Sequence, residues 1–333
     1  MKIIFQQFLF PAVFCLIGVL AVLYFGFKPF NHSSLIHLTS LILLGIAIFS
    51  NVSGIDQEFV NKNKQQIFSL VILGVIYKAA IIGSVGFLLT GEKVYFVIGG
   101  ILAQIDPVLT SYVIEKLNVS EKVKQISKIE SSFDDLFSII WTSFILFPAV
   151  FGIYSTFGSS VTILLIFIFA FVFILAHKFL LPDKGFIGSS SVIVNAICNT
   201  TMATAFVAWY LRMDEKIFHK TIPLVTALSY IIIGFYFPSG FDLNNLYMGV
   251  FIAFVLVYIA RRSQVYLFLS NYNKKDKAFL ASNQQQGLTS IVLLISAVPI
   301  FGTELVGIVI PAMLTVNILF YINNAYNLWK FNT

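Results

Sequence analysis

The chain has 333 residues, of which 58% are hydrophobic and only 11% are charged, and its formal net charge is +6. Soluble domains carry about 25% charged residues, so this composition, with a mean hydropathy of +0.91, excludes a soluble fold and indicates a lipid bilayer as the solvent. The basic residues are spread among the loops between apolar runs, which argues against a nucleic-acid partner.

Apolar runs long enough to cross a hydrocarbon core recur along the whole chain. They cover residues 8–27, 35–52, 67–89, 94–117, 129–153, 161–181, 222–237, 246–260, 289–300 and 305–328. No stretch between them is long enough for a soluble domain, so we expect one all-α, polytopic membrane domain over residues 1–333 and no soluble regulatory domain. The first run lacks a small-residue cleavage site and is predicted to be a retained helix. Cys15 and Cys198 have no Cys or His at ligand spacing, so no cofactor is expected.

Polar residues interrupt the third and fourth runs. Lys78, within "VIYKAAIIG" (75–83), is isolated in the sequence, and it either snorkels to the membrane surface or pairs with an acid. In "GGILAQIDPVLTSYVIEKL" (99–117), Asp106 and Pro107 break an apolar helix. Proline frees carbonyl groups of the preceding turn, near Ala103, and carbonyls beside a carboxylate form a plausible cation site. The alternative is a kinked helix with a purely structural role.

The stretch "SKIESSFDDLFSIIWTSFILF" (127–147) places three acids in an apolar run. Glu130 and Asp134 share one helix face, and Asp135 lies about 100° further round. Two adjacent carboxylates in a low dielectric do not both ionise easily, so one is expected to hold a proton unless a cation replaces it. Competition between a proton and a cation is what ion exchange requires. The alternative places the acids at the interface, as charges near a helix N-terminus.

The region 185–213 is either one long crossing or a hairpin of two short ones that meet near Asn199. With one crossing there are eleven in total, and the loop bases divide 9 against 11. With two there are twelve, and every Lys and Arg except Lys28, Lys93 and the intrahelical Lys78 lies on one side. Cytoplasmic loops carry the excess of bases, so we predict about twelve segments with both termini cytoplasmic.

Several motifs, in this order, resemble those of the monovalent cation:proton antiporter superfamily, the sodium/proton exchangers and their bacterial relatives. "QIDPVLTSYVI" (104–114) resembles the Thr-Asp-Pro-Val signature of the first discontinuous helix, and "ESSFDDLF" (130–137) the Glu-x-x-x-(Asn/Asp)-Asp signature that follows. Residues 223–246 resemble a Pro-Leu-Phe-Phe segment of the proton-coupled branch. "YIARRSQVYLFL" (258–269) is similar to the Arg-bearing helix, and "QQQGLTSIVLLISA" (284–297) to the second discontinuous helix.

The resemblance implies roles for particular residues. Asp135 would bind the monovalent cation and the proton alternately, with Asp134 as its partner in the cation site. Asp106 would be a third ion- or proton-binding carboxylate and would stabilise the crossing of the two broken helices. Glu130 and Arg261 would form a structural ion pair, whereas the neighbouring Arg262 is predicted to snorkel at a helix end.

The crossing of the broken helices is expected at Pro107, Gln286, Gly287 and Thr289. Segments 3–5 and 10–12 would be inverted repeats and would form a core, about 67–153 and 246–328, that moves against a scaffold. The adjacent Asp–Asp pair resembles electrogenic members, but the Glu and Arg are typical of electroneutral ones, so the stoichiometry stays open.

The resemblance predicts a secondary antiporter, not an enzyme, that exchanges Na+ or Li+, with K+ as the alternative, for protons by alternating access and serves pH homeostasis. It also implies a homodimer in the inner cell membrane. The chain departs from the family's residue pattern at two positions, Ile105, where the family usually has Thr, and Gln286, where many relatives have Arg. These two residues favour the alternative of a transport-dead sensor or a channel. A sodium-coupled organic anion transporter is a further alternative. An intramembrane aspartyl protease is disfavoured because its two acids would lie on facing helices.

Overall fold

Every regular element in the described part of the chain is a helix, so the predicted all-α fold is confirmed. The computed structural model describes residues 2–114, 119–142, 160–179, 183–198, 200–213, 220–239 and 242–332. The expected turning point at Asn199 and the end of the fifth apolar run, 143–153, lie outside the described residues.

The helices follow the apolar runs closely. The first half of the chain contains α1 (Lys2–Phe25), η1 (Pro29–His32), α2 (Ser33–Ser53), α3 (Gln57–Lys62), α4 (Lys64–Phe68), η2 (Ser69–Leu73), α5 (Gly74–Thr90), α6 (Val94–Leu102), α7 (Pro107–Ile114) and α8 (Glu121–Ile140). The second half contains α10 (Ser160–Phe179), α11 (Lys184–Ile197), α12 (Ala203–Leu211), α13 (Ile222–Tyr236), α14 (Leu243–Phe254), η5 (Val255–Arg261), α15 (Arg262–Phe268), α16 (Lys274–Ser282), α17 (Leu288–Phe301) and α18 (Glu304–Asn332).

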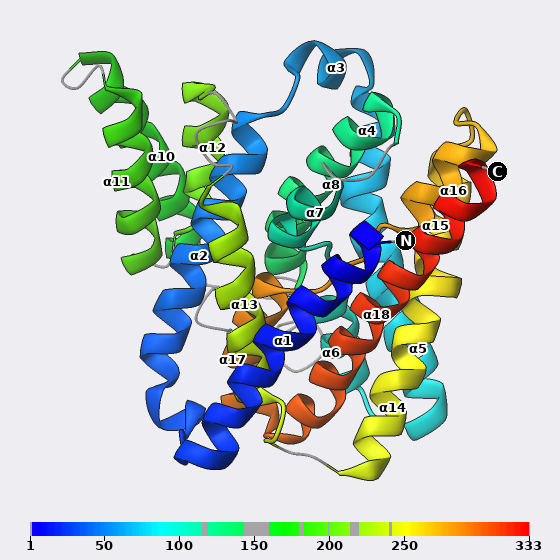
Figure 1. Ribbon diagram of the computed structural model, residues 1–333. Helices are drawn as coiled ribbons and strands as arrows, with labels where there is room; N and C mark the ends of the chain where they lie inside the picture. Colours follow the sequence, from blue (N-terminus) through cyan, green and yellow to red (C-terminus); the bar gives the residue numbers. More distant parts are fainter. Residues whose placement is uncertain are drawn as a thin grey trace.

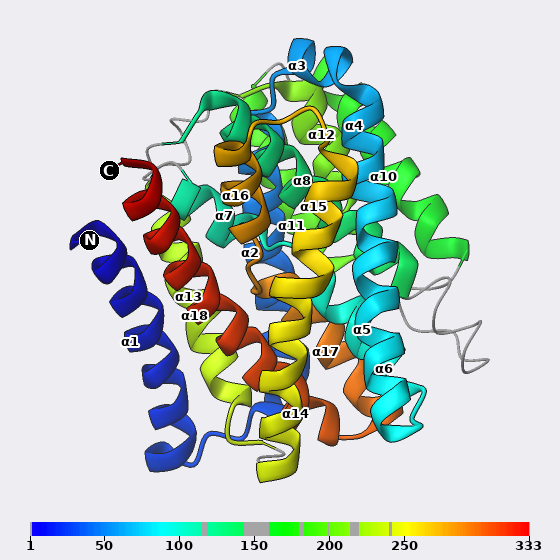
Figure 2. The ribbon, with the colours of Figure 1, turned by 90° about the vertical axis from the view of Figure 1, so that its right-hand side faces the viewer.

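The long helices run side by side between an upper and a lower end of the molecule (Figures 1 and 2). Helix α5 packs against α6, α1 against α13 and α14 against α18. Four continuous helices of the described chain are long and apolar enough to cross a membrane, namely Ser33–Ser53, Lys64–Thr90, Leu243–Phe268 and Glu304–Phe331. Five shorter apolar helices accompany them. The chain is therefore a multi-pass membrane protein.

The ambiguous region 185–213 contains two helices, α11 and α12, that pack against each other and against α2. Asp183 starts α11 by accepting hydrogen bonds from the backbone N–H groups of Gly185 and Phe186. The chain reverses direction after α11, as a hairpin requires (Figure 1). The total of twelve crossings stays a prediction.

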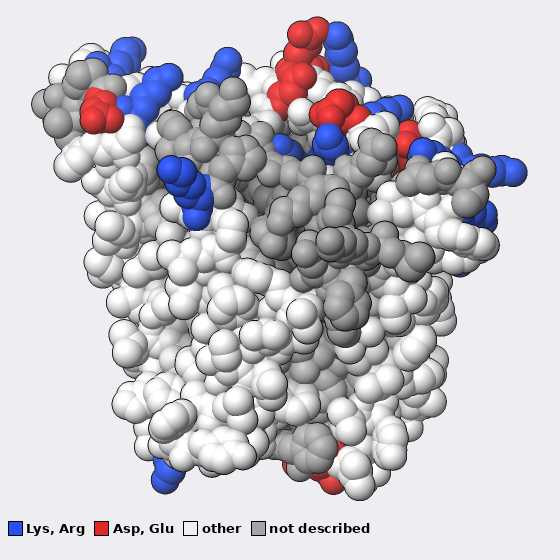
Figure 3. All heavy atoms as spheres, in the orientation of Figure 1, with Lys and Arg blue, Asp and Glu red and all other residues white. Residues whose placement is uncertain are grey.

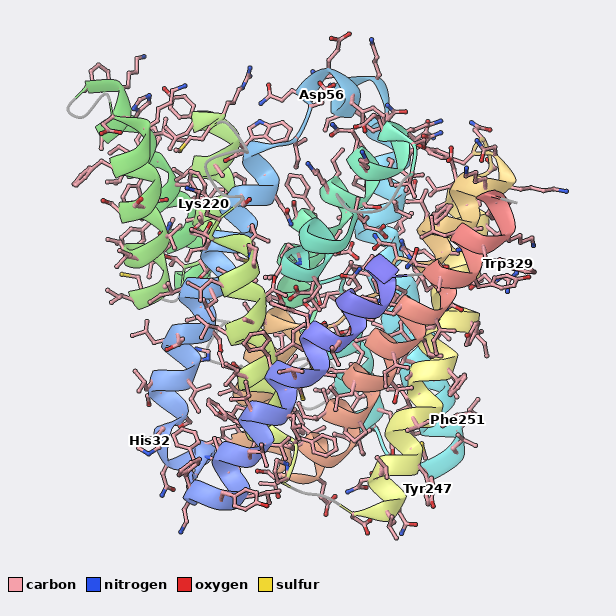
Figure 4. All side chains as sticks on the ribbon, in the orientation of Figure 1. His32, Asp56, Lys220, Tyr247, Phe251 and Trp329 are labelled. Atoms are coloured by element: carbon pink, nitrogen blue, oxygen red, sulfur yellow. The ribbon has the colours of Figure 1, made fainter. Side chains whose placement is uncertain are left out.

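Charge is distributed unevenly between the two ends of the molecule. On the visible face, Lys and Arg gather at the upper end of the molecule (Figure 3). The turns that carry Lys28 and Lys93 connect α1 to α2 and α5 to α6 at the lower end (Figure 2). Exposed aromatic side chains include Tyr247 of α14, near the lower end, at 68% exposed, and Trp329 of α18, higher up, at 64% exposed (Figure 4).

Two of the segments are broken in the middle, as the resemblance implied. The first is α6 and α7, which are separated by residues 103–106, and the second is α16 and α17, which are separated by residues 283–287. They run in opposite directions (Figures 1 and 2). The two breaks touch, because the backbone N–H of Asp106 donates to the carbonyl of Gln285 at 3.2 Å. This crossing lies beside α8 and forms the centre of the candidate site.

Candidate functional site

Helix α8 carries the three acids of the predicted signature into the protein interior. Ser120 caps its N-terminus by accepting from the backbone N–H of Val123, and the helix continues without a break to Ile140. Glu130, Asp134 and Asp135 are each 0% exposed. The alternative that these acids are interfacial charges near a helix N-terminus is therefore wrong.

Glu130 forms a bidentate ion pair with Arg261, the last residue of η5, and both side chains are fully buried. The second of its two hydrogen bonds joins Arg261 Nη2 to Glu130 Oε2 at 2.7 Å. Arg261 also donates from Nε and Nη2 to the carbonyl of Leu280 in α16, at 3.1 and 2.8 Å. The pair that the resemblance implied thus joins α8, η5 and α16.

Gln264 completes the surroundings of this pair. Its side-chain carbonyl accepts from Arg261 at 3.0 Å, and its amide donates to the carbonyl of Leu70 in η2 at 2.9 Å. Both η2 and η5 are π-helical, and such turns leave backbone groups without their usual helical partners. Gln264 was not predicted as a site residue, although it lies three residues after Arg261 on the same helix face.

Asp134 pairs with Lys78 of α5. Lys78 Nζ lies 3.0 Å from Asp134 Oδ2, and both side chains are 0% exposed. Lys78 Nζ also approaches the side-chain carbonyl of Gln284 at 3.5 Å. The choice that the sequence left open for Lys78 is thereby decided in favour of an acidic partner.

Asp135, the next residue, has different surroundings. Both of its carboxylate oxygens are buried, and neither has a hydrogen-bond partner of ordinary geometry among the described residues. Its polar and charged neighbours are Asp106, the Thr289 hydroxyl, Asp134 and Lys78. A buried carboxylate without a fixed donor is costly, so the site is chemically suited to a mobile positive charge.

Asp106 connects the two broken helices. Its Oδ1 accepts from the backbone N–H of Leu109 in α7 at 2.9 Å, and its Oδ2 accepts from that of Leu288 in α17 at 2.7 Å. One carboxylate therefore caps the N-termini of both second halves, where the helix dipoles favour negative charge. Gly287 allows this approach, because a Cβ at that position would overlap with the Asp106 carboxylate.

The carbonyls at the end of α6 are occupied by side chains from the second break. Gln286 Nε2 donates to the backbone carbonyl of Leu102 at 2.8 Å and to that of Gln104 at 3.0 Å. Gln284 Nε2 also donates to the backbone carbonyl of Gln104, at 2.7 Å. The single hydroxyl proton of Ser290 is directed to Gln286 Oε1 at 2.5 Å, which orients the Gln286 amide toward these carbonyls. The carbonyls of Leu102 and Gln104 therefore accept from neutral donors of the other broken helix, and the cation site expected near Ala103 stays a prediction.

Three further residues hold the crossing together. Asn317 of α18 binds the backbone of Gln286 on both sides, accepting from its N–H at 2.9 Å and donating to its carbonyl at 2.8 Å. Asn317 was not predicted from the sequence, although a lone amide in an apolar run is the signal that identifies it. Ile105 is fully buried within the first break, and Pro107 begins α7. The site therefore consists of a crossing with internal hydrogen bonds and one adjacent carboxylate, Asp135.

Comparisons with known proteins agree with this architecture. A family model described as "Sodium/hydrogen exchanger, transmembrane" matches residues 2–190, more than half of the chain. The fold is similar to the structure of the sodium proton antiporter MjNhaP1 from Methanocaldococcus jannaschii at pH 8. The two structures superpose with a TM-score of 0.69 and 17% sequence identity, over 95% of this chain and 90% of the antiporter chain. A second structure of the same antiporter, from an EM map, superposes with a TM-score of 0.66 and 19% sequence identity, over 95% of this chain and 89% of the antiporter chain. A search of curated protein sequences finds no match.

Proposed function

Because the chain belongs to the sodium/hydrogen exchanger family, whose members are transporters rather than enzymes, we propose that it exchanges a monovalent cation for a proton at the carboxylate of Asp135. Family and fold together support cation/proton antiport. The observation that carries the residue assignment is that Asp135 is buried at the helix crossing without a fixed donor among the described residues.

The exchange follows from competition for one negative charge. A buried carboxylate is stabilised when a proton neutralises it or when a desolvated cation binds it. The proton and the cation therefore exclude each other from the site. The Thr289 hydroxyl, which faces Asp135, supplies an oxygen of the kind that hard monovalent cations prefer. Na+ and Li+ are the proposed cations, with K+ as the alternative.

Alternating access would come from the two inverted groups of helices. In this proposal the core, about residues 67–153 and 246–328, moves as a unit and carries Asp135 between the two sides of the membrane. The crossing supports such motion because Asp106, Gln286 and Asn317 bind both broken helices to each other and to α18. We further propose a homodimer in the inner cell membrane, with the base-rich upper end in the cytoplasm.

The test is cation-dependent dissipation of an imposed pH gradient in proteoliposomes, with Na+, Li+, K+ and choline as the negative control. We expect at least one alkali cation to collapse the gradient. We also expect its apparent KM to rise about tenfold per unit of falling pH once protons occupy the site. Asp135→Asn is expected to abolish exchange, whereas Asp242→Asn, on an exposed position between α13 and α14, is the matched control and is expected to retain it.

The stability of the variant separates exchange from folding. Asp135 makes no fixed hydrogen bond with described residues, so Asp135→Asn is expected to unfold at the same temperature as the wild type or higher. A protein that is folded yet dissipates no gradient with any cation would overturn the antiporter proposal and favour the sensor. Cation flux without proton coupling would favour the channel, and uptake that requires an organic anion would favour the cotransporter.

A further inference from the structure

Basic side chains from three helices meet at a surface cavity that the proposed exchange does not use. The cavity has a volume of about 440 Å³ and lies between η5 and α15 on one side and α16 and α18 on the other. Arg262 of α15, Lys274 of α16 and Lys330 of α18 line it, and its wall contains no Asp or Glu among the described residues. We propose that this cavity binds the phosphate headgroup of an anionic phospholipid. The inference goes beyond cation exchange and does not depend on it.

The two adjacent arginines at the junction of η5 and α15 have opposite environments. Arg261 is fully buried and binds Glu130. Arg262 is exposed, lines the cavity and lies with its guanidinium 6.0 Å from the centre of the Tyr266 ring. Snorkelling, as predicted for Arg262, brings a guanidinium to the level of the lipid phosphates. The charge of Arg262 therefore belongs to the surface cavity and not to the helix crossing.

The positive charge of the cavity is not cancelled from within the described part of the chain. Neither Arg262 nor Lys274 forms an ion pair with a described residue. The one acid in the sequence of α16, Asp276, accepts hydrogen bonds from Ser120 at 3.1 Å and from Asn273 at 3.0 Å. Since Asp276 is outside the cavity wall, the cavity is suited to an anion.

Hydrogen bonds between neutral side chains fix the walls of the cavity relative to one another. The Tyr258 hydroxyl donates to Asn323 Oδ1 at 3.1 Å and so joins η5 to α18. Asn327 Nδ2 donates to the carbonyl of Ala278 at 3.0 Å and to Ser282 Oγ at 2.8 Å, which joins α18 to α16. The cavity is thus preformed, and its volume lies within the range of about 300 to 1,000 Å³ that is typical of ligand pockets.

The surroundings of the cavity favour a lipid over a soluble anion. Tyr266 and Tyr326 line it and are exposed, and tyrosine is enriched at the headgroup level of a bilayer. Ile259 and Ile322, each next in the chain to a lining residue, are exposed apolar side chains that acyl chains can cover. Helices α15 and α16 lie in the upper half of the molecule, toward its base-rich end (Figures 1 and 2). Basic pockets between membrane helices on the cytoplasmic side are known to bind anionic headgroups.

A bound headgroup would connect three helices of the core. Its phosphate oxygens would accept charge-assisted hydrogen bonds from Arg262, Lys274 and Lys330, and the arginine fork matches phosphate geometry. Helix α16 is the first half of the second broken helix, and α18 carries Asn317, which binds the backbone of the break that follows α16. Because the folded protein alone offers this cavity, the lipid should stabilise the folded state.

The test counts the lipids that bind to the protein. Detergent-solubilised protein that has been washed free of lipid is titrated with dioleoyl phosphatidylglycerol, dioleoyl phosphatidylcholine or glycerol 3-phosphate, and native mass spectrometry measures the occupancy. We expect phosphatidylglycerol to saturate one site per chain and to raise the unfolding temperature. Phosphatidylcholine, whose headgroup has no net charge, should bind at least fivefold more weakly. Glycerol 3-phosphate, which has the phosphate but no acyl chains, should not displace phosphatidylglycerol at equal concentration.

Variants with matched changes of charge locate the site. Each base near an anionic lipid contributes about fivefold in affinity, so Arg262→Gln combined with Lys274→Gln should weaken phosphatidylglycerol binding about 30-fold. Without lipid this double variant should unfold close to the wild-type temperature, because both side chains are exposed. The control combines Lys64→Gln with Lys184→Gln, at exposed positions of α4 and α11 outside the cavity, and should keep the wild-type affinity. Lys330→Gln, on a different helix, should weaken binding about fivefold and tests the same cavity independently.

Three results would overturn the inference. Equal losses of affinity in the two double variants would assign the binding to diffuse surface charge and not to the cavity. Equal affinities for phosphatidylglycerol and phosphatidylcholine would show that the bases do not select the headgroup. Displacement of the lipid by glycerol 3-phosphate at equal concentration would make a soluble phosphate compound the ligand. Each of these readouts is independent of cation exchange, so a failure of the proposed antiport would leave the lipid site untouched.

Discussion

The two broken helices meet at one crossing, but their first halves end in different ways. At the end of α6, the carbonyls of Leu102 and Gln104 accept from neutral amides of Gln284 and Gln286. At the end of α16, the carbonyl of Leu280 accepts from the guanidinium of Arg261. The second halves, α7 and α17, share one cap, the Asp106 carboxylate.

The contrast between the two ends shows where charge is needed at a broken helix inside a membrane. Neutral donors suffice for α6 because the second break brings several amides to the same place. The end of α16 is held instead by an arginine whose own charge is balanced by Glu130. The presence of Gln286, where many relatives have Arg, therefore has a physical explanation, because its amide donates directly to the carbonyls of Leu102 and Gln104. The comparison also predicts that charged and neutral contacts differ in how much stability they contribute.

The largest effect is expected at the charged end. Arg261→Ala leaves Glu130 as an uncompensated buried charge and the Leu280 carbonyl without its donor, so it should lower the free energy of unfolding by about 3 to 5 kcal/mol. The measurement is unfolding of the purified protein in detergent. Arg262→Ala, at the adjacent exposed position with its guanidinium 6.0 Å from the Tyr266 ring, is the matched control and should cost about 1 kcal/mol or less. Equal losses in both variants would contradict the assigned role of Arg261.

The shared cap comes next. Asp106→Ala removes acceptors from α7 and α17 together, and since each cap contributes about 1 to 2 kcal/mol, we expect a loss of about 2 to 4 kcal/mol. Asp56 accepts from Glu58 and Phe59 at the start of the short surface helix α3, so Asp56→Ala is the control and should cost about 1 kcal/mol. The same unfolding assay compares them. A loss no greater than that of the control would show that Asp106 does not support both helices.

A smaller effect is expected at the neutral end. Gln286→Ala leaves the Leu102 carbonyl without its donor and should lower the free energy of unfolding by about 1 to 3 kcal/mol. Gln285 is equally buried, but its side-chain amide makes a single hydrogen bond, of 3.5 Å, to the Asn283 side chain. Gln285→Ala is therefore the matched control and should lower the free energy of unfolding by less. Chemical denaturation of both variants decides the order, and the reverse order would contradict our account of the α6 terminus.

The smallest effect tests whether burial, and not charge alone, gives the Arg261 pair its importance. Glu58 and Lys62 form an ion pair on α3, but their side chains are 75% and 70% exposed. Solvent screens such a pair, so Glu58→Gln should change the free energy of unfolding by about 0.5 kcal/mol or less. A loss comparable to that of Arg261→Ala would mean that burial does not explain the difference between the two pairs.

The sequence alone established that the chain is an all-helical membrane protein, because mean hydropathy follows from composition and the apolar runs of membrane-spanning length follow from the order of residues. Motif order also placed Asp106, Glu130, Asp135 and Arg261 near one another. These predictions succeed because a charged residue in an apolar run must find a partner or a water-filled path, and few are available. The predicted hairpin followed from counting bases, which depends on sequence position alone.

Only the tertiary structure decided which polar groups meet. Lys78 and Asp134 are 56 residues apart, and their pairing depends on how α5 packs beside α8. The donors to the carbonyls of Leu102 and Gln104 could not be recognised from the sequence, because Gln284 and Gln286 come from the other broken helix. Hydropathy and local spacing determine which segments enter the membrane, whereas contacts between distant segments determine which carboxylate is left without a fixed partner. That physical difference is why the sequence predicted the class of protein, and only the fold distinguished Asp135 from its neighbour Asp134.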